Sequence, residues 1–139
     1  MRSTFLVNAV YTDSAREYGI TQQQGQLLCV LMAQPYGMSE LGAVLGLAKS
    51  SLTGLVDRTE RNGLVQRRPD PQDSRAVRVA LTKRGAKLAD AFYTETCRRI
   101  EELTSGFAPA ERDLLATLLG RVVTDNQAPV VFMDGDSPH

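Results

Sequence analysis

The 139-residue sequence predicts a mainly α-helical fold with one small β-hairpin in its middle. Two features of the apolar pattern support this fold class. Apolar residues recur every three or four positions before residue 63 and after residue 82, as they do in amphipathic helices. Between these stretches they alternate with polar residues, as they do in strands. The length fits one compact unit, expected over residues 1–126, with residues 127–139 as a loose tail.

The first two helices are expected over residues 4–18 and about 21–33. Gly19 ends the first apolar stripe, since glycine commonly follows the last turn of a helix. Thr21 and Gln24 form a capping-box pattern, in which each side chain satisfies a free backbone amide at a helix start. The second helix is therefore predicted to begin at this cap.

Two shorter helices follow, joined by a tight turn that contains glycine. Ser39 is expected to cap the first of them and Gly46 to end it. The second is expected over residues 49–62, with buried positions three or four apart at Leu52, Leu55, Val56 and Thr59. Such a pair forms a helix-turn-helix, whose second helix can lie in the major groove of DNA.

A β-hairpin is expected after these helices. Short strands at 64–68 and 77–81 flank the run at 69–74, whose two prolines cannot supply the amide hydrogens that continuous strand pairing needs. The hairpin is therefore expected to end in a polar, exposed tip, which is called a wing. With the two short helices it completes a winged helix-turn-helix at about 36–87.

Two longer helices complete the predicted fold. Thr82 caps a helix at about 83–104, and Pro109 opens the last one, at about 109–125. The last helix carries a dense apolar stripe that needs a partner surface, formed by Leu114, Leu115, Leu118, Leu119 and Val122.

Charge is unevenly distributed along the chain. The formal net charge is zero, but residues 49–87 hold ten basic and four acidic side chains, a balance of +6 that the other residues offset. A basic middle segment suits contact with DNA phosphates, and acidic flanks suit another task such as dimerisation. Chance clustering of charge on a solvated face is the alternative.

The residues predicted to contact DNA lie on the second helix of the helix-turn-helix and on the wing. Hydroxyl side chains and free amides at a helix start can bind base edges or phosphates, and arginines on a narrow projection can enter a minor groove. Gly54 either allows a close approach to DNA or is a tolerated surface glycine. Asp73 either orients Arg75 or forms a turn. The predicted DNA-binding residues are Lys49, Ser50, Ser51, Thr53, Gly54, Arg58, Arg67, Arg68, Asp73 and Arg75.

Enzymatic, metal and cofactor chemistry have little support in the sequence. The only histidine is His139, so no histidine-based catalytic group or zinc site is expected within the fold. The sequence contains no glycine-rich loop of the kind that cradles phosphates, and catalysis by carboxylates alone is the one enzymatic alternative. We therefore expect neither an enzyme nor a bound cofactor.

A cytoplasmic protein without a membrane partner is expected. No stretch is apolar and long enough to cross a bilayer, and the first eight residues lack the features of a secretory leader. The two cysteines, Cys29 and Cys97, are too few for a disulfide framework and are expected to act as small buried hydrophobes. A role in sensing oxidants is their alternative.

Several segments together resemble the multiple antibiotic resistance regulator (MarR) family. The most specific part is the tip Asp73-Ser74-Arg75 followed by Leu81-Thr82 and Gly85, because a generic helix-turn-helix would not contain it. The resemblance covers nearly the whole chain and is strongest from Met38 to Leu88. It is carried by Ser39-Glu40-Leu41, Leu47 to Thr53, Val56-Asp57-Arg58, Gly63-Leu64-Val65, Arg67 to Val77, and Leu81 to Gly85.

The resemblance implies a ligand-responsive transcriptional repressor that binds a palindromic operator in double-stranded DNA. It implies a homodimer formed by the helices at about 4–18, 83–104 and 109–125, with reading helices in major grooves and wings in minor grooves. Residue by residue, it assigns Ser50, Ser51, Thr53 and Arg58 to the reading helix and Asp73 and Arg75 to the wing.

The resemblance also implies a small aromatic or anionic effector in a cleft beside the DNA-binding part. Tyr11, Tyr18 and Gln22 are the candidate lining residues, and core or surface packing is the alternative for each. Two other functions stay open. One is a redox-sensing regulator acting through Cys29 or Cys97, and the other is a winged-helix protein-interaction module that does not read DNA.

Two departures from the family pattern bear on stability and assembly. Thr59 stands where the family usually has a leucine, which predicts looser packing of the core. The first helix is short at its N-terminus, which puts its share of the dimer contact in question.

Overall fold

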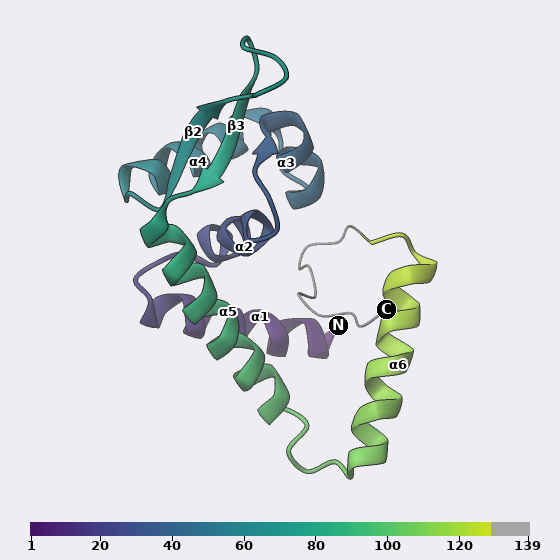
Figure 1. The fold of residues 1–139 in the computed structure, drawn as a ribbon. Helices are drawn as coiled ribbons and strands as arrows, with labels where there is room; N and C mark the ends of the chain where they lie inside the picture. Colours follow the sequence, from purple (N-terminus) through teal and green to yellow (C-terminus); the bar gives the residue numbers. More distant parts are fainter. Residues whose placement is uncertain (129–139) are drawn as a thin grey trace.

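A computed structural model describes residues 1–128 of the chain, and the predicted fold class is confirmed (Figure 1). Helices dominate, and a three-stranded antiparallel sheet supplies the hairpin. From residue 129 onward, the predicted loose tail at 127–139 lies outside the described residues. Among the helices of residues 1–128, none combines the length and apolarity that crossing a membrane requires.

The first two helices, α1 (Arg2–Glu17) and α2 (Gln22–Leu31), meet at the predicted capping box. The Thr21 hydroxyl accepts a hydrogen bond from the Gln24 backbone amide at 3.1 Å, and the Gln24 side-chain oxygen accepts one from the Thr21 amide at 3.0 Å. Helix α1 begins two residues earlier than the sequence predicts, and α2 ends two residues earlier. Gly19 follows α1 with a φ of +67°, a left-handed conformation that glycine adopts without strain.

The helix-turn-helix consists of α3 (Met38–Leu45) and α4 (Lys49–Arg61). The predicted Ser39 cap is wrong, because α3 already begins at Met38 and its N-cap is the extended Gly37. A short strand, β1 (Tyr36–Gly37), leads directly into the helix and moves its start forward. Gly46 ends α3 in the left-handed conformation, with a φ of +64°.

The sheet has the strand order β1-β3-β2. Strands β2 (Val65–Pro69) and β3 (Val77–Leu81) form the predicted hairpin, in which Arg67 pairs with Val79. Strand β1 pairs antiparallel with β3 and was not expected, because two residues are too few to show an alternating pattern. Figure 1 shows the hairpin projecting from the top of the winged unit, away from α1 and the lower half of α5.

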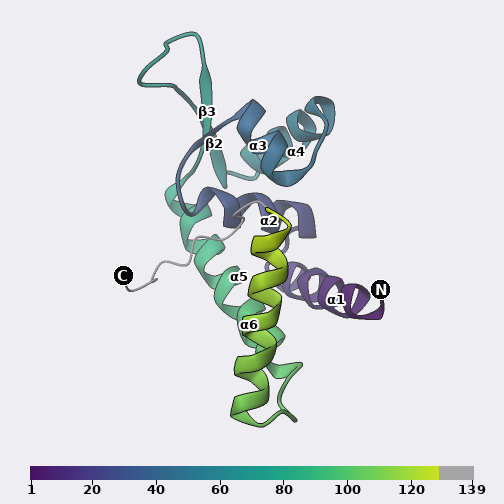
Figure 2. The same cartoon turned by 90° about the vertical axis from the view of Figure 1, so that its right-hand side faces the viewer.

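Helix α5 (Lys83–Glu102) connects the winged unit to α6 (Pro109–Asp125). Its Ala89 and Phe92 belong to the hydrophobic core, which includes buried residues of α1, α2, α3, α4, β2 and β3. Helix α6 turns back from the end of α5 (Figures 1 and 2). None of its residues is buried against the rest of residues 1–128. Its apolar stripe is 48% to 59% exposed at Leu114, Leu118, Leu119 and Val122.

The buried polar side chains of the core have partners. Thr59 is fully buried, and its hydroxyl donates to the Leu55 carbonyl oxygen at 2.7 Å and accepts from the Gln24 side-chain amide at 3.5 Å. The threonine that replaces the family's usual leucine is therefore satisfied, and the expected loosening has no sign in these contacts. Between α1 and α5, the buried hydroxyls of Ser14 and Thr96 form a hydrogen bond of 2.8 Å.

We expect Ser14→Ala to lower the free energy of unfolding by about 1–2 kcal/mol, because it leaves the Thr96 hydroxyl buried without this partner. Urea denaturation of Ser14→Ala, Thr96→Val and the double variant measures the effect, with the exposed Thr94→Ala as control. The double variant should lose less than the two single losses combined. Losses that simply add would mean that the hydrogen bond does not stabilise the fold.

Candidate nucleic-acid interface

The outer face of α4 presents the predicted hydroxyl residues at its N-terminus. Lys49, Ser50 and Ser51 are exposed, and Ala48 at the N-cap provides no side-chain hydrogen bond to the first turn. The amides of this turn therefore have no intrahelical acceptor and can bind an anionic group such as a phosphate. The Thr53 hydroxyl donates to the Lys49 carbonyl oxygen at 2.8 Å and is half-buried.

Gly54 lies beside the exposed Arg58 on the same helix. A Cβ atom at Gly54 would lie 3.3 Å from a guanidinium nitrogen of Arg58 and would meet no other atom within 4 Å. The glycine thus leaves room for the arginine to lie along the helix. This contact within the protein is a third explanation for Gly54, besides the two that the sequence suggested.

The wing tip is shaped by two aspartates. Asp73 accepts a hydrogen bond from the backbone amide of Arg75 at 3.0 Å, so its carboxylate forms the turn instead of holding the arginine side chain. Asp70 accepts from the Gln72 amide at 2.9 Å and from the Arg78 guanidinium at 3.0 Å, and both contacts lower the pKa of its carboxyl group. The tip between these anchors is exposed from Pro71 to Arg75.

Arg67 connects the wing to α4. Its guanidinium lies 2.6 Å from the Asp57 carboxylate and 2.6 Å from the Glu60 carboxylate, and Glu60 also accepts from the Arg67 backbone amide at 3.0 Å. These hydrogen bonds raise the pKa of Arg67. The guanidinium is engaged by two carboxylates of α4, because β2 passes beside that helix. Contact between Arg67 and DNA stays a prediction.

The charge that remains on this surface is positive. Of the ten basic residues between Lys49 and Lys87, only Arg67 and Arg78 form ion pairs with other residues in the described part of the chain. These two pair with three of the four acidic residues of the segment, and the fourth, Asp73, is engaged by a backbone amide. Arg68 and Arg75 are both exposed on the wing. The surface can therefore attract a polyanion.

The base of the wing is joined tightly to the start of α5. The Thr82 hydroxyl caps α5 by accepting from the Gly85 amide at 3.0 Å and donates to the Gly63 carbonyl oxygen at 2.7 Å. A Cβ atom at Gly85 would lie 1.8 Å from the Leu64 carbonyl oxygen. Only glycine allows this approach, which gives a physical reason for the Leu81-to-Gly85 segment of the sequence pattern.

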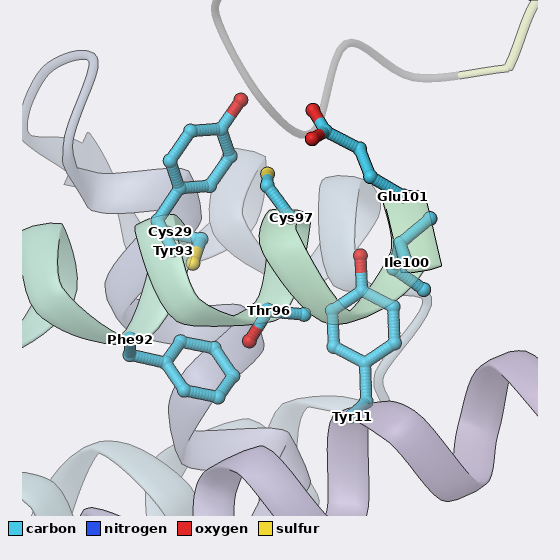
Figure 3. A pocket seen from close by; sticks show the side chains of 8 residues that line it. All are labelled: Tyr11, Cys29, Phe92, Tyr93, Thr96, Cys97, Ile100 and Glu101. Atoms are coloured by element: carbon cyan, nitrogen blue, oxygen red, sulfur yellow. The ribbon is translucent and has the colours of Figure 1, made fainter. Parts of the chain in front are cut away.

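A cavity of about 450 Å³ lies between α1, α2 and α5, away from the wing (Figure 3). Figure 3 shows Tyr93, Cys97 and Glu101 projecting to one side of α5 and Phe92 and Thr96 to the other. The volume of the cavity falls in the usual range for sites that bind small molecules. The lining residues are Tyr11, Cys29, Phe92, Tyr93, Thr96, Cys97, Ile100 and Glu101.

Of the three residues predicted to line a ligand site, only Tyr11 lines this cavity. Tyr18 packs edge-on against Phe92, with ring centroids 6.2 Å apart. Gln22 is hydrogen-bonded to Thr12 and Asn8 of α1. The sequence pattern did not indicate the lining residues of α5, because residues of an apolar stripe have the same spacing whether they fill a core or border a cavity.

Both cysteines border the cavity as free thiols. Burial raises the pKa of the Cys29 thiol to about 12, with a smaller contribution from Cys97. The thiolate is the form that reacts with oxidants, so Cys29 is a poor candidate for the redox role that was the alternative. Cys97 is half-buried.

Comparison with known proteins identifies relatives over most of the chain. Residues 18–76 match the sequence model of the MarR family. The HTH-type transcriptional repressor NicR of Pseudomonas putida is 33% identical over 86% of this chain and 76% of its own length. The uncharacterized HTH-type transcriptional regulator YkoM of Bacillus subtilis is 32% identical over 81% and 74%. The crystal structure of apo wild-type MarR from E. coli matches with a TM-score of 0.73 and 30% identity, over 88% of this chain and 95% of that one.

Proposed function

The chain belongs to the MarR family of winged helix-turn-helix transcriptional regulators, and from this premise we propose that it represses transcription by binding a palindromic DNA operator as a homodimer. We further propose that a small molecule bound in the cavity beside α5 releases the DNA. The cytoplasmic location expected from the sequence agrees with such a role. The repressor name of the relative from Pseudomonas putida supports repression over activation.

One observation carries the DNA-binding proposal. The exposed wing arginines, Arg68 and Arg75, and the uncapped start of α4 belong to one braced unit, because Arg67 ties the hairpin to α4. A helix start that can bind phosphates beside a cationic projection is the pairing that a winged helix uses on adjacent grooves. Three of the four acidic residues of this segment pair with Arg67 or Arg78, so the unpaired charge that phosphates would meet is mainly positive.

Selection of DNA from a random pool by the purified protein tests this function. A palindrome with half-sites about one helical turn apart is expected, because the two reading helices of a symmetric dimer contact the same face of the duplex. Binding to the selected DNA should weaken steeply as salt increases. Enrichment of no sequence, together with no salt-dependent binding, would favour the protein-interaction module instead.

The proposed dimer is supported by exposed apolar surface at both ends of the described chain. On α6, Leu114, Leu118 and Val122 follow one another at helical spacing and are exposed in the part of the chain that the structure describes. On α1, Phe5 is 76% exposed. Contiguous apolar surface of this kind is rare on monomers and common at interfaces between subunits.

We expect Leu118→Glu to dissociate the dimer, because it places a charge in the middle of the apolar face of α6. Light scattering after size exclusion should report a mass near the 15.2 kDa of one chain instead of twice that value. Thr117→Glu adds the same charge on the opposite face of α6 and should leave the mass of the dimer unchanged. A Leu118→Glu protein that stays dimeric would place the subunit contact elsewhere.

A further inference from the structure

The cavity beside α5 has an aromatic and apolar wall with a single ionised group. Tyr11, Phe92, Tyr93 and Ile100 provide most of the carbon surface. Among the lining residues of the described part of the chain, Glu101 is the only carboxylate, and none is a lysine, arginine or histidine. Figure 3 places the Glu101 carboxylate on the same side of α5 as Tyr93 and Cys97. Within residues 1–128, the cavity therefore offers a carboxylate, and no cationic side chain, to a ligand.

The arginines closest in sequence to this wall are already neutralised. Arg98 is paired with Glu95 and Glu102. Arg99 lies 2.6 Å from the carboxylate of Glu17 and 2.7 Å from that of Glu95. Neither arginine lines the cavity. An anionic ligand would have to draw one of them out of these pairs before it found a counter-charge.

The pKa values of two titratable groups in the cavity also indicate that it disfavours negative charge. Burial raises the pKa of the Tyr11 hydroxyl and of the Cys29 thiol, and in both cases the smaller contributions from neighbouring groups act in the same direction. Removal from water disfavours the charged form of each group, and none of the described residues that line the cavity is a cation that would compensate. A carboxylate on a ligand would meet the same cost on entering this space.

We propose that the effector of this cavity is an aromatic molecule with a cationic or uncharged polar group, and that a cationic group would lie beside Glu101. This inference rests on the proposed function and specifies the ligand class of its regulatory site. Of the aromatic or anionic effectors that the resemblance implied, the anionic ones are disfavoured at this cavity. Two tyrosine rings and a carboxylate line the cavity. Aromatic rings attract cations through cation–π interactions, and the carboxylate attracts them through its negative charge.

Three probes of one shape separate the possibilities. Benzamidine, benzamide and benzoate share one aromatic ring and are nearly equal in size. Benzamidine is positively charged, benzamide is uncharged and benzoate is negatively charged. Calorimetric titration of the full-length protein should give the affinity order benzamidine, benzamide, benzoate. Benzamidine should bind at least about tenfold more tightly than benzoate. An exposed carboxylate changes affinity by about threefold to tenfold for each step, from benzamidine to benzamide and from benzamide to benzoate.

Two variants test whether Glu101 causes the preference for the cationic probe. Glu101→Gln should remove most of the advantage of benzamidine over benzamide and leave the affinity for benzamide unchanged. Asp90→Asn, which removes an exposed carboxylate of the same helix outside the cavity, is the matched control and should change none of the three affinities. A preference for benzamidine that survives Glu101→Gln would overturn the role of Glu101.

Two further outcomes would contradict the ligand class. Tighter binding of benzoate than of benzamidine would reverse the proposed charge, and binding of none of the three probes would mean that the cavity does not hold aromatic ligands. Failure of the proposed function is distinguishable, because gel-shift titration of the unmodified protein against selected DNA measures it without any ligand. If benzoate were the only one of the three probes to release that DNA, the proposed repressor function would stand and only the proposed ligand class would be wrong.

Discussion

An Arg75→Ala variant is expected to bind operator DNA at least about tenfold more weakly than the unmodified protein, while remaining a folded dimer. Arg75 is exposed at the wing tip, forms no ion pair with another described residue, and uses only its backbone amide to hold the turn. The loss of its side chain therefore removes a contact to DNA without disturbing the hairpin. Gel-shift titration at several salt concentrations measures the effect.

The salt dependence tests the cause of that loss. Each phosphate contact contributes about 0.9 to the slope of log affinity against log salt, so the loss of two wing contacts per dimer should reduce the slope by about 2. An Arg75→Ala protein with unchanged affinity would remove the wing from the proposed interface. A weaker affinity with an unchanged slope would mean that Arg75 acts without touching phosphates.

Arg67→Lys provides the contrast on the same hairpin, at a position in β2 instead of at the tip. Lysine keeps the positive charge, but it cannot bridge Asp57 and Glu60 as the planar guanidinium does. We expect the affinity for DNA to fall about threefold with no change in the salt slope, because the brace is weakened and no phosphate contact is lost. An unchanged affinity would instead indicate that the charge alone matters, as it would for a residue that contacts DNA directly.

Gly85→Ala is expected to destabilise the fold by about 4 kcal/mol, a large fraction of the stability of a small domain. The added Cβ would lie 1.8 Å from the Leu64 carbonyl oxygen, which is a backbone atom and cannot rotate away. The same oxygen accepts the hydrogen bond from the Thr82 amide at 3.1 Å. Relief of the clash would separate the base of the wing from the cap of α5.

Thermal and urea denaturation measure this loss, and Gly106→Ala is the matched control. A Cβ at Gly106 meets no atom within 4 Å, so the control should retain nearly the full stability. If Gly85→Ala were as stable as this control, the backbone of α5 and that of the hairpin would not be in the close contact described above. A destabilised protein that still bound DNA at low temperature would assign Gly85 to folding and not to recognition.

Local patterns were enough to predict most of the elements. The capping box at Thr21 and Gln24, the left-handed glycines at 19 and 46, and the change of apolar period after residue 63 are each complete within a few neighbouring residues. The sequence missed β1 because its two residues gain strand geometry only by pairing with β3. It misplaced the start of α3 for the same reason, since Gly37 belongs to that strand.

For the candidate site, too, the sequence predicted some features and missed others. The sequence located the reading helix and the wing, because the residue types needed to contact phosphates are concentrated there. It did not separate Arg67 from Arg68 and Arg75, although Arg67 alone of these three has its charge engaged by carboxylates in the described chain. It also named Tyr18 and Gln22, neither of which borders the cavity beside α5. Tyr18 borders a separate cavity together with Arg61 and Arg84, and Gln22 is hydrogen-bonded to α1, so their role in ligand binding stays a prediction.

By itself, then, the sequence determined the order of helices and strands, the basic segment and the family, because periodicity, caps and motifs act over short distances along the chain. Only the tertiary structure decided which wing arginine pairs with carboxylates of α4, which side chains border the cavity and which charged side chains line it. These properties depend on elements far apart in the chain, such as α4 beside β2 and α1 beside α5, whose contacts no local pattern specifies.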